Sequence, residues 1–436
     1  MAAHNCERDL ASLAGEGSIF GGSATAKLER LLAELELLSC RYDVVVANPP
    51  YMGSSSLGKW MGAWVKKRYP EAYRDLCTSF IDRGFALSTA NGYSAMVTMQ
   101  SWMFLGSFEK LRGKILRNHS ISSMAHLGTR AFGAIAGEVV STTATVFANE
   151  KSEVKGAYFR LVDMGSEAEK QAGLLEALAN PNCGWFYRAD AQKFNTIPGI
   201  PIAYWASDSA IDGFRKGKSL SSVANPKQGL KTADNKRFLR YWFEVDFSHI
   251  TFGCTSRSEA VKLNGKWFPY IKGGEFRKWY GNCLYVIDWE RDGQAIKELV
   301  LKKYPYLSTP DFVVKNQKYY FLENITWTVI SSGKLALRYT PEGYLFDGTG
   351  SCIFAEPVTL KYLQAYLNSS TASVYASYLS PTLTFEVGQV AEYPVIEATD
   401  KNLSSICAIV DMERAVCSAD WDAFEQSMDF KRHPLL

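Results

Sequence analysis

Hydrophobic positions in the first third of the chain alternate between two periodicities. Short continuous apolar runs, typical of buried strands, alternate with segments whose apolar positions recur every three to four residues, as on a helix face. The expected strands are residues 42–47, 93–99, 121–128 and 141–149, and the expected helices are residues 71–90 and 107–118. We expect Asn91-Gly92 to form a turn and Ser107 to cap the second helix. This order predicts an α/β domain with a parallel sheet covered on both faces.

The pattern changes from about Ile202 onward. Short runs rich in Trp, Tyr and Phe are interrupted there by Gly, Pro and Asn, which is typical of strands joined by turns. Residues 402–430 and residues 24–38 have helical spacing, and the second of these follows the glycine-rich stretch GEGSIFGGS. The expected organisation is an α/β domain at residues 1–200, a β-rich α+β domain at 201–400 and a C-terminal helical segment at 401–436.

Composition narrows the class of protein. The 436 residues suffice for two domains, and no apolar run of membrane-spanning length occurs. The first residues are acidic and have no apolar core of a secretory signal, so we expect a cytoplasmic protein. Nine cysteines without any CxxC pair favour reduced thiols over disulfides, and we expect no metal site. A net charge of +3 is too small to indicate a nucleic-acid partner by itself.

The strand at residues 42–47 ends at Asn48-Pro49-Pro50-Tyr51, the motif with the clearest chemistry in the chain. Ligands of open α/β sheets bind beyond the carboxyl ends of the strands, where Asn48 falls. The prolines stiffen the backbone and remove two N–H donors. The Asn48 side-chain oxygen and the Pro49 carbonyl can then accept protons from an exocyclic amine of a heteroaromatic base, while Tyr51 stacks on its ring. The alternative is a strand-ending turn, since Asn and Pro are common in turns.

The stretch YDVVVANPPYMG resembles motif IV of the amino-methylating DNA methyltransferases, in which Asp, Asn or Ser precedes Pro-Pro and an aromatic residue. The NPPY form is typical of enzymes that make N6-methyladenine. Further stretches are similar to the large adenine-specific methyltransferases of the BREX and phage-growth-limitation defence systems: GYSAMVTMQSWMFLGSFEKLR, HLGTRAFGAIAGEVVSTTATVF, KQGLKTADNKRFLRYW, KWFPYIKGGEFRKWYGN and LSPTLTFEVGQVAEYPV. The resemblance covers most of the chain from about Ser18 to Pro394. It implies a Rossmann-like catalytic sheet, a target-recognition domain and double-stranded DNA as the substrate.

The resemblance also implies S-adenosylmethionine as the cofactor, bound by a glycine-rich motif I after the first strand of the sheet. Only 47 residues precede Asn48, and FGGSA at residues 20–24 is the sole candidate, without a preceding strand. We therefore expect a partial Rossmann-like sheet that lacks the cofactor half. A sheet cut in this way presents an unpaired edge and bare apolar faces. The first 150 residues would pair with another polypeptide, form a homo-oligomer or cover the edge with the N-terminal helix.

The second half combines positive charge with aromatic residues. Residues 227–279 hold eleven Lys and Arg against five Asp and Glu, a mixture that suits DNA phosphates and bases. The alternative is an ordinary solvated face. Two segments of this half supply candidate DNA-contacting residues: Lys231, Asn235 and Arg237 in GLKTADNKRF, and Lys272, Gly273, Arg277, Lys278 and Trp279 in KGGEFRKWYGN. In the first half, Phe132 lies in the loop RAFGAIAGE, where the resemblance implies contacts to the target base, and it is the candidate for a second stacking residue. The Gly273-Gly274 pair has a second interpretation, a hairpin turn that needs positive φ.

Two other functions fit the same residues. A non-catalytic DNA-specificity or scaffold subunit of a defence complex could retain the NPPY motif only as ancestry. A methyltransferase acting on another planar amide, such as protein glutamine, also uses NPPY, but the basic aromatic second half disfavours it. His119 and His126 have no Cys or carboxylate at ligand spacing, so we expect structural roles for both.

Overall fold

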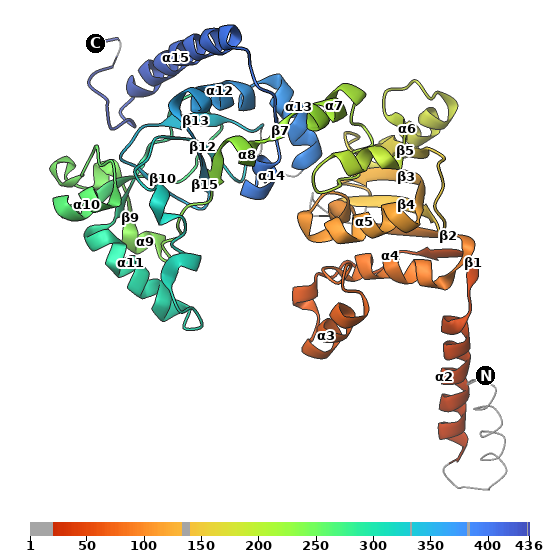
Figure 1. The fold of residues 1–436 in the computed structure, drawn as a ribbon. Helices are drawn as coiled ribbons and strands as arrows, with labels where there is room; N and C mark the ends of the chain where they lie inside the picture. Colours follow the sequence, from red (N-terminus) through yellow and green to blue (C-terminus); the bar gives the residue numbers. More distant parts are fainter. Residues whose placement is uncertain (1–20, 133–139, 332–333, 382–383, 434) are drawn as a thin grey trace. The chain divides into compact units, whose positions relative to one another are not determined.

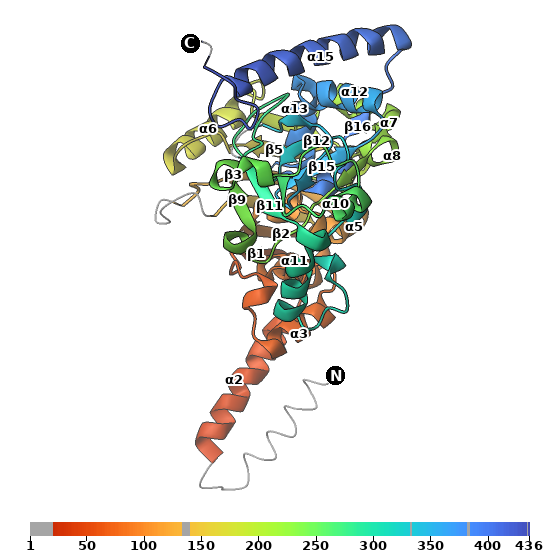
Figure 2. The same ribbon diagram turned by 90° about the vertical axis from the view of Figure 1, so that its left-hand side faces the viewer.

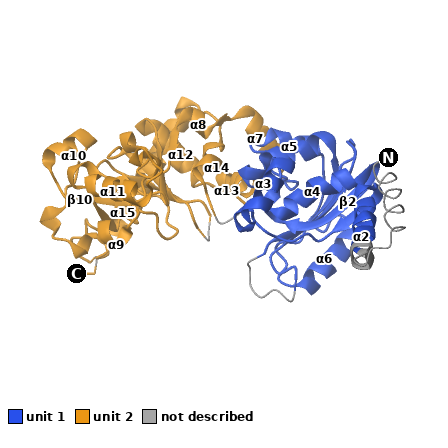
Figure 3. Ribbon diagram, turned by 90° about the horizontal axis from the view of Figure 1, so that it is seen from below, with its two compact units in different colours: residues 1–205 blue, residues 206–436 orange. Residues whose placement is uncertain are grey.

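The computed structural model describes residues 21–132, 140–331, 334–381, 384–433 and 435–436. The chain divides into two compact units, residues 1–205 (unit 1) and residues 206–436 (unit 2), coloured separately in Figure 3. Each unit has its own apolar core. The two units are described separately below.

Unit 1 is built on a six-stranded mixed sheet in the order β1-β2-β4-β3-β5-β6 (Figure 1). The strands are β1 (Tyr42–Ala47), β2 (Ser88–Met99), β3 (Ser120–Gly128), β4 (Thr142–Ala148), β5 (Gly156–Arg160) and β6 (Phe186–Ala189). All four strands expected from the apolar runs are present. Strands β1, β2, β3 and β5 run in one direction, because β1–β2 and β3–β5 pair in parallel and β4 pairs antiparallel with both β2 and β3.

The expectation of a purely parallel sheet is wrong, since β4 and β6 run against the other four strands. Adjacent antiparallel strands need no crossover helix, and β4 follows β3 in the chain as its direct neighbour. The apolar run of β4 did not reveal its direction because β4 is buried along almost its whole length, as expected for a strand of a parallel sheet. The carboxyl ends of β1, β2 and β3 nevertheless lie at one edge of the sheet, which is the edge that carries Asn48.

Helices cover the two faces of this sheet unequally. The helices of unit 1 are α2 (Gly21–Ser39), α3 (Lys59–Arg68), α4 (Leu76–Leu87), α5 (Glu109–Asn118) and α6 (Glu167–Ala179). Helices α4 and α5 pack on one face and contribute apolar residues to a shared core with β3 and β4. Helix α6 packs on the opposite face near β5. The expected cap of α5 is wrong: Ser107 lies in a 3-10 turn, and Phe108 precedes the helix without a side-chain cap.

The outer strand β1 is irregularly paired and open. Asn91 and Gly92 lie inside β2 rather than in a turn, because the β1–β2 register slips between Tyr42 and Val44 and leaves extra residues in β2. A Cβ atom at Gly92 would lie 2.8 Å from the backbone oxygen of Asp43, so the slip needs glycine there. The side chains of residues 27–39 in α2 are not buried, and α2 extends away from the sheet in both views (Figures 1 and 2). The described part of α2 therefore does not cover this edge.

Unit 2 contains two four-stranded sheets, in the orders β14-β10-β11-β9 and β13-β12-β15-β8, and a short β16-β7 pair. Its strands are β7 (Lys218–Ser219), β8 (Asn225–Lys227), β9 (Leu239–Tyr241), β10 (Trp267–Ile271), β11 (Tyr285–Asp288), β12 (Asn324–Thr328), β13 (Leu337–Thr340), β14 (Leu345–Phe346), β15 (Gly350–Phe354) and β16 (Pro394–Val395). A large core of aromatic and aliphatic side chains joins the β10 sheet to β15 and α11.

Unit 2 is more helical than its aromatic runs predicted. Its helices are α7 (Asp208–Lys216), α8 (Leu220–Val223), α9 (Asn235–Phe238), α10 (Arg257–Leu263), α11 (Glu290–Lys303), α12 (Pro357–Leu367), α13 (Ser370–Leu379), α14 (Val387–Ala391) and α15 (Asp400–Asp422). The run RYWFEVDF is only briefly a strand, because residues 242–244 form a 3-10 turn capped by Glu244. The expected C-terminal helix is present but ends at Asp422 instead of continuing to residue 430.

The cysteines, possible metal ligands and helix lengths of the described residues bear on the chemistry of the chain. The eight cysteines among them are all free thiols. Within the same residues, no group of three or more His, Cys, Asp and Glu side chains could hold a metal ion. None of the helices between residues 21 and 436 whose placement is described is both long and apolar enough to cross a membrane.

Candidate functional site

The motif Asn48-Pro49-Pro50-Tyr51 lies directly after β1, at the carboxyl edge of the sheet. Asn48 is exposed, whereas Pro49 is buried. The buried Pro49 therefore anchors the loop, and the side chain of Asn48 remains accessible to a ligand. The Tyr51 hydroxyl donates a hydrogen bond to Asn48 Oδ1 over 3.2 Å. The amide oxygen is thereby oriented while it keeps a lone pair for another donor.

A carboxylate that the sequence did not single out holds this loop in place. Asp75 Oδ1 accepts from the backbone N–H of Met52 at 3.3 Å and from that of Cys77 at 2.9 Å, and the latter bond caps helix α4. The backbone N–H of Leu76 donates to the Met52 carbonyl over 2.9 Å. One side chain therefore ties the motif to the start of α4. The signal available in the sequence was Asp75 as a helix N-cap, 24 residues beyond Tyr51.

Burial raises the pKa of the Tyr51 phenol, and the nearby Cys77 thiol adds to this shift. Burial, followed by the charge of Asp75, raises the pKa of the Cys77 thiol as well. Both groups are therefore neutral near pH 7, and the Tyr51 hydroxyl keeps its proton for Asn48. The loop thus offers a neutral acceptor and an aromatic ring, without a general base at the motif.

The next strands of the same edge end in a buried polar network. His126 Nε2 lies 2.8 Å from Gln100 Oε1, and His126 Nδ1 lies 3.0 Å from the Tyr204 hydroxyl. Since Gln100 Oε1 can only accept, Nε2 carries the proton and Nδ1 accepts from Tyr204. Burial, with Arg160 and Lys170 nearby, lowers the pKa of His126 to about 3. This neutral, fully bonded imidazole has the structural role expected for it, and His119 stacks on Phe85 with ring centroids 3.6 Å apart.

Phe132, the candidate second stacking residue, follows the carboxyl end of β3 and is half-buried. Strand β3 is parallel to β1 and separated from it by β2 and β4, so Phe132 belongs to the same edge of the sheet as Asn48. The rest of its loop, residues 133–139, lies outside the described residues.

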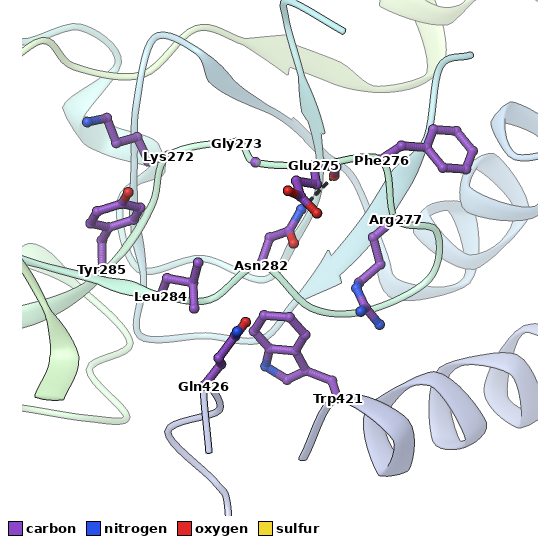
Figure 4. A pocket seen from close by; sticks show the side chains of 11 residues that line it. Lys272, Gly273, Glu275, Phe276, Arg277, Asn282, Leu284, Tyr285, Trp421 and Gln426 are labelled. Atoms are coloured by element: carbon purple, nitrogen blue, oxygen red, sulfur yellow. Dashed lines mark hydrogen bonds between the residues drawn. The ribbon is translucent and has the colours of Figure 1, made fainter. Parts of the chain in front are cut away.

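The candidate recognition loop joins β10 to β11 and lines a pocket of about 460 Å³ (Figure 4). Its walls come from the loop, from β11 and from the end of the chain: Lys272, Gly273, Gly274, Glu275, Phe276, Arg277, Asn282, Leu284, Tyr285, Trp421 and Gln426. Lys272 Nζ lies 5.2 Å from the Tyr285 ring centroid, and Phe276 is exposed at the rim. The pocket combines two cations with aromatic surfaces.

The C-terminal segment positions Arg277 in this pocket. Arg277 Nη1 lies 3.1 Å from Asp420 Oδ2, and its guanidinium lies 5.0 Å from the Trp421 ring centroid. Gly273 and Gly274 have φ of +90° and +138°, so the positive φ expected of this pair is present, within the long loop between β10 and β11. A Cβ at Gly274 would lie 2.8 Å from Asn282 Nδ2, which itself donates to the Glu275 carbonyl over 2.8 Å. The close approach requires glycine.

The other candidate residues of unit 2 lie outside this pocket. Lys278 Nζ donates to the Asn368 carbonyl over 2.6 Å, and the backbone of Trp279 bonds to Leu337 and Tyr339 of β13. Lys231 lines a separate aromatic cavity of about 200 Å³ with Tyr306, Phe312 and Lys315. Asn235 and Arg237 belong to the short helix α9: Asn235 Oδ1 accepts from the Thr232 hydroxyl, and the Arg237 guanidinium lies over Phe238.

Comparison with known proteins gives consistent matches. The family described as Eco57I restriction-modification methylase matches residues 23–132, which include the motif and α3 to α5. "Adenine-specific methyltransferase PglX" of Lacticaseibacillus casei (strain Zhang) is 40% identical over 416 residues, covering 94% of this chain and 34% of that protein. "Adenine-specific methyltransferase BrxX" of Escherichia coli O9:H4 (strain HS) is 39% identical over 432 residues, covering 98% of this chain and 33% of that protein. The chain spans about a third of the length of these relatives.

Solved structures match the fold at low identity. The Type IIL restriction-modification enzyme MmeI, determined in complex with DNA, aligns with a TM-score of 0.55 and 14% identity, covering 91% of this chain and 51% of MmeI. A nuclease-deletion mutant of the Type ISP enzyme LlaGI, in complex with a DNA substrate mimic, aligns with a TM-score of 0.52 and 11% identity, covering 94% of this chain and 37% of LlaGI. These likenesses concern the fold alone.

Proposed function

Because the chain is homologous to about a third of the adenine-specific methyltransferases PglX and BrxX, we propose that it is the target-base and DNA-specificity part of an adenine-N6 DNA methyltransferase of a phage-defence system. The observation that carries this proposal is the exposed Asn48 side chain beyond β1, oriented by Tyr51. Such a site must accept hydrogen bonds from the two N–H groups of the adenine N6 amine. The motif supplies two acceptors, Asn48 Oδ1 and the Pro49 carbonyl oxygen.

The proposed mechanism is positioning. The adenine is extruded from the duplex. One N–H of its N6 amine donates a hydrogen bond to Asn48 Oδ1, and the other donates a hydrogen bond to the Pro49 carbonyl oxygen. Both bonds draw the nitrogen toward tetrahedral geometry, which frees the lone pair that is otherwise delocalised into the ring. Tyr51 holds the base by stacking, and its hydroxyl keeps the amide of Asn48 oriented. No basic side chain is needed to activate the amine.

Methyltransferase homologues imply the use of S-adenosylmethionine, which would supply the methyl group. Gly21 and Gly22 lie within helix α2, and β1 is the first strand among the described residues. Among the described residues ahead of the motif, no strand is followed by a glycine-rich loop and a helix. Residues 21–47 therefore do not fit the cofactor. The chemistry assigned to this chain is confined to the target base.

We assign the cofactor site to a polypeptide segment that pairs with the open edge of β1. Among the described residues, β1 pairs only with β2, and Val44 and Val46 on one of its faces are 58% and 74% exposed. An open apolar groove of about 370 Å³ continues this face across the sheet. It is lined by Val46, Ala47, Ala95, Met96, Val97, Ser123, Met124, Ala125, Ala144, Thr145, Val146, Phe159, Leu174 and Leu178. An added strand and a covering helix would satisfy both features.

In unit 2, the β10–β11 pocket is the proposed DNA-reading site. Lys272 and Arg277 would bind phosphates or base edges, and Phe276 would stack on a base. Arg277 suits base reading best, because its guanidinium is already oriented by Asp420 and Trp421.

The test replaces the matching third of BrxX by this chain and measures adenine methylation and DNA affinity. Asn48→Ala removes one of two acceptors and should lower the methylation rate by about 100-fold or more, with unchanged DNA affinity. Asn118→Ala, an exposed asparagine at the end of α5, is the matched control and should have no effect. Equal methylation by the Asn48 variant would instead support the non-catalytic scaffold function.

A further inference from the structure

Helix α3 has no role in the mechanism above, yet it belongs to the same substructure as the motif. Residues 54–74 leave the sheet after the motif and return to it at α4. A bridge between Gly53 and Asp75, and a hydrogen bond of 2.9 Å from the Ser54 N–H to the Arg74 carbonyl, close this excursion at its base. Its end is the carboxylate that positions the motif loop. The position of α3 is therefore coupled to that of Asn48 through a few bonds.

Side chains of α3 are anchored on one face only. Val65 is 1% exposed and holds the helix to unit 1. Trp60 is 74% exposed, and Trp64, one turn later on the same face, is 46% exposed and meets Tyr69 edge-on at 6.0 Å. Two exposed tryptophans one turn apart form a flat aromatic surface that the fold itself does not use.

Positive charge surrounds these tryptophans. From Tyr51 to Pro70 the chain has no Asp or Glu, and α3 carries Lys59, Lys66, Lys67 and Arg68. Among the described residues, no carboxylate forms a salt bridge with any of these four side chains. The negative end of the helix dipole favours cations in the last turn, which accounts for the charge but not for the tryptophans. Cations beside exposed aromatic rings are the combination that binds the phosphates and bases of nucleic acid.

Helix α3 also differs in charge from the apolar groove on the sheet face, which is the surface assigned to the cofactor segment. The groove on the sheet face is lined without a single Lys, Arg, Asp or Glu side chain, so it suits an apolar protein partner. The α3 surface combines its exposed aromatic rings with Lys67 and Arg68, which helical spacing places near the same face, and suits a polyanion. Two surfaces of such different chemistry point to two different partners.

We propose that α3 is a DNA-binding element that holds the duplex around the extruded adenine. Its Lys and Arg side chains bind phosphates, and Trp60 stacks on the bases that lose their neighbour when the adenine leaves the helix. This inference rests on the proposed function and adds to it a contact on the catalytic unit, separate from the recognition loop of unit 2.

The test measures binding of the full chain to a synthetic duplex oligonucleotide and to the same duplex with one abasic site, from about 50 to 200 mM salt. Lys67→Ala/Arg68→Ala should reduce the slope of log affinity against log salt by about 2, close to 0.9 per lost phosphate contact. Trp60→Ala should leave the slope unchanged but reduce the preference for the abasic duplex by about tenfold. Lys110→Ala/Arg117→Ala removes two exposed cations from α5 and is the control.

Three outcomes would overturn the proposal. Wild-type slope and preference in both α3 variants, with circular dichroism showing an intact fold, would exclude DNA contact by α3 alone. Normal DNA binding combined with lost association with the remaining part of BrxX would assign α3 to a protein interface. Absence of DNA binding by the unsubstituted chain would remove the proposed function as well, so the two failures are distinguishable.

Discussion

The outer strands β1 and β13 differ in how their free edges are treated. The backbone N–H of Leu337 in β13 donates to Asn368 Oδ1 at 2.9 Å, and its carbonyl accepts from Asn368 Nδ2 at 3.0 Å. The backbone of Trp279 bonds to the same strand, which is almost entirely buried. Among the described residues, strand β1 pairs only with β2, so its other edge is open, and its side chains Val44 and Val46 are exposed to solvent. Exposed strand edges promote association. Unit 2 closes its β13 edge internally, whereas the described residues of unit 1 leave the β1 edge open.

This contrast changes the interpretation of Lys278 and Trp279. Both were candidate DNA contacts, but Lys278 donates to the carbonyl at the end of α12, and the backbone of Trp279 closes β13. Their described contacts are therefore structural. The DNA-reading role proposed for the loop rests on Lys272, Phe276 and Arg277, which line the pocket, with Arg277 directed toward Trp421 (Figure 4).

The largest expected difference between the units is in how much their free energies of unfolding fall at acidic pH. Burial lowers the pKa of His126 to about 3, against about 6.5 for an unfolded histidine, so between these values only the unfolded state binds the proton. The free energy of unfolding of unit 1 is therefore complete above pH 6.5 and should fall by up to about 4 kcal/mol toward pH 3. Urea denaturation at several pH values measures it. His126→Gln should reduce the pH dependence of the profile, and the remainder should come from His119, whose pKa burial lowers to about 4. A flat wild-type profile would contradict the assignment.

The closed edge of unit 2 should be sensitive to its capping side chain. Asn368→Ala leaves the buried N–H of Leu337 without its amide partner, whereas the Leu337 carbonyl keeps the Trp279 N–H, so the change should cost about 2 kcal/mol of stability. Asn118→Ala on an exposed helix end is the control and should change stability by less than about 0.5 kcal/mol. Thermal or urea unfolding distinguishes the two. Equal stability of both variants would mean that the β13 edge does not depend on Asn368.

The smallest effect on stability should come from the open edge. Val44→Lys/Val46→Lys places charges on exposed positions and should change the free energy of unfolding by less than about 0.5 kcal/mol. It should nevertheless abolish self-association of the isolated chain and pairing with the remaining part of BrxX. Light scattering at high concentration and co-purification measure both effects. An unsubstituted chain that stays monomeric and fails to pair would contradict the assignment of β1 as an interface.

Local patterns predicted much of unit 1 and less of unit 2. The four apolar runs became strands, and Asn48 lies beyond one of them, because strand formation and the motif are properties of consecutive residues. The antiparallel direction of β4 was missed because direction depends on which strands become neighbours. Asp75 was missed for the same reason, since its bond to Met52 joins two segments that only the fold brings together.

The pocket of unit 2 could be predicted only in part. Lys272, Gly273 and Arg277 were identified from charge and glycine content, but the wall formed by Trp421 and Gln426 comes from the far end of the chain. A single sequence carries no signal for a contact between residues 277 and 420. The aromatic runs were assigned as strands too often because aromatic residues also pack against a core from short turns, as the partly buried Trp242 does in its 3-10 turn.

The contact between Arg277 and the end of α15 has a consequence for transplanting the proposed DNA-reading loop between related proteins. The β10–β11 loop is continuous in sequence and looks like a segment that can be transplanted alone. Its arginine, however, rests on Asp420 and Trp421, and Trp242 Nε1 donates to the Gln426 carbonyl over 2.8 Å to hold that part of the chain in place. A transplanted loop without its C-terminal helix would lose one wall of its pocket. The unit of exchange is therefore the loop together with the last third of α15 and the turn that follows it.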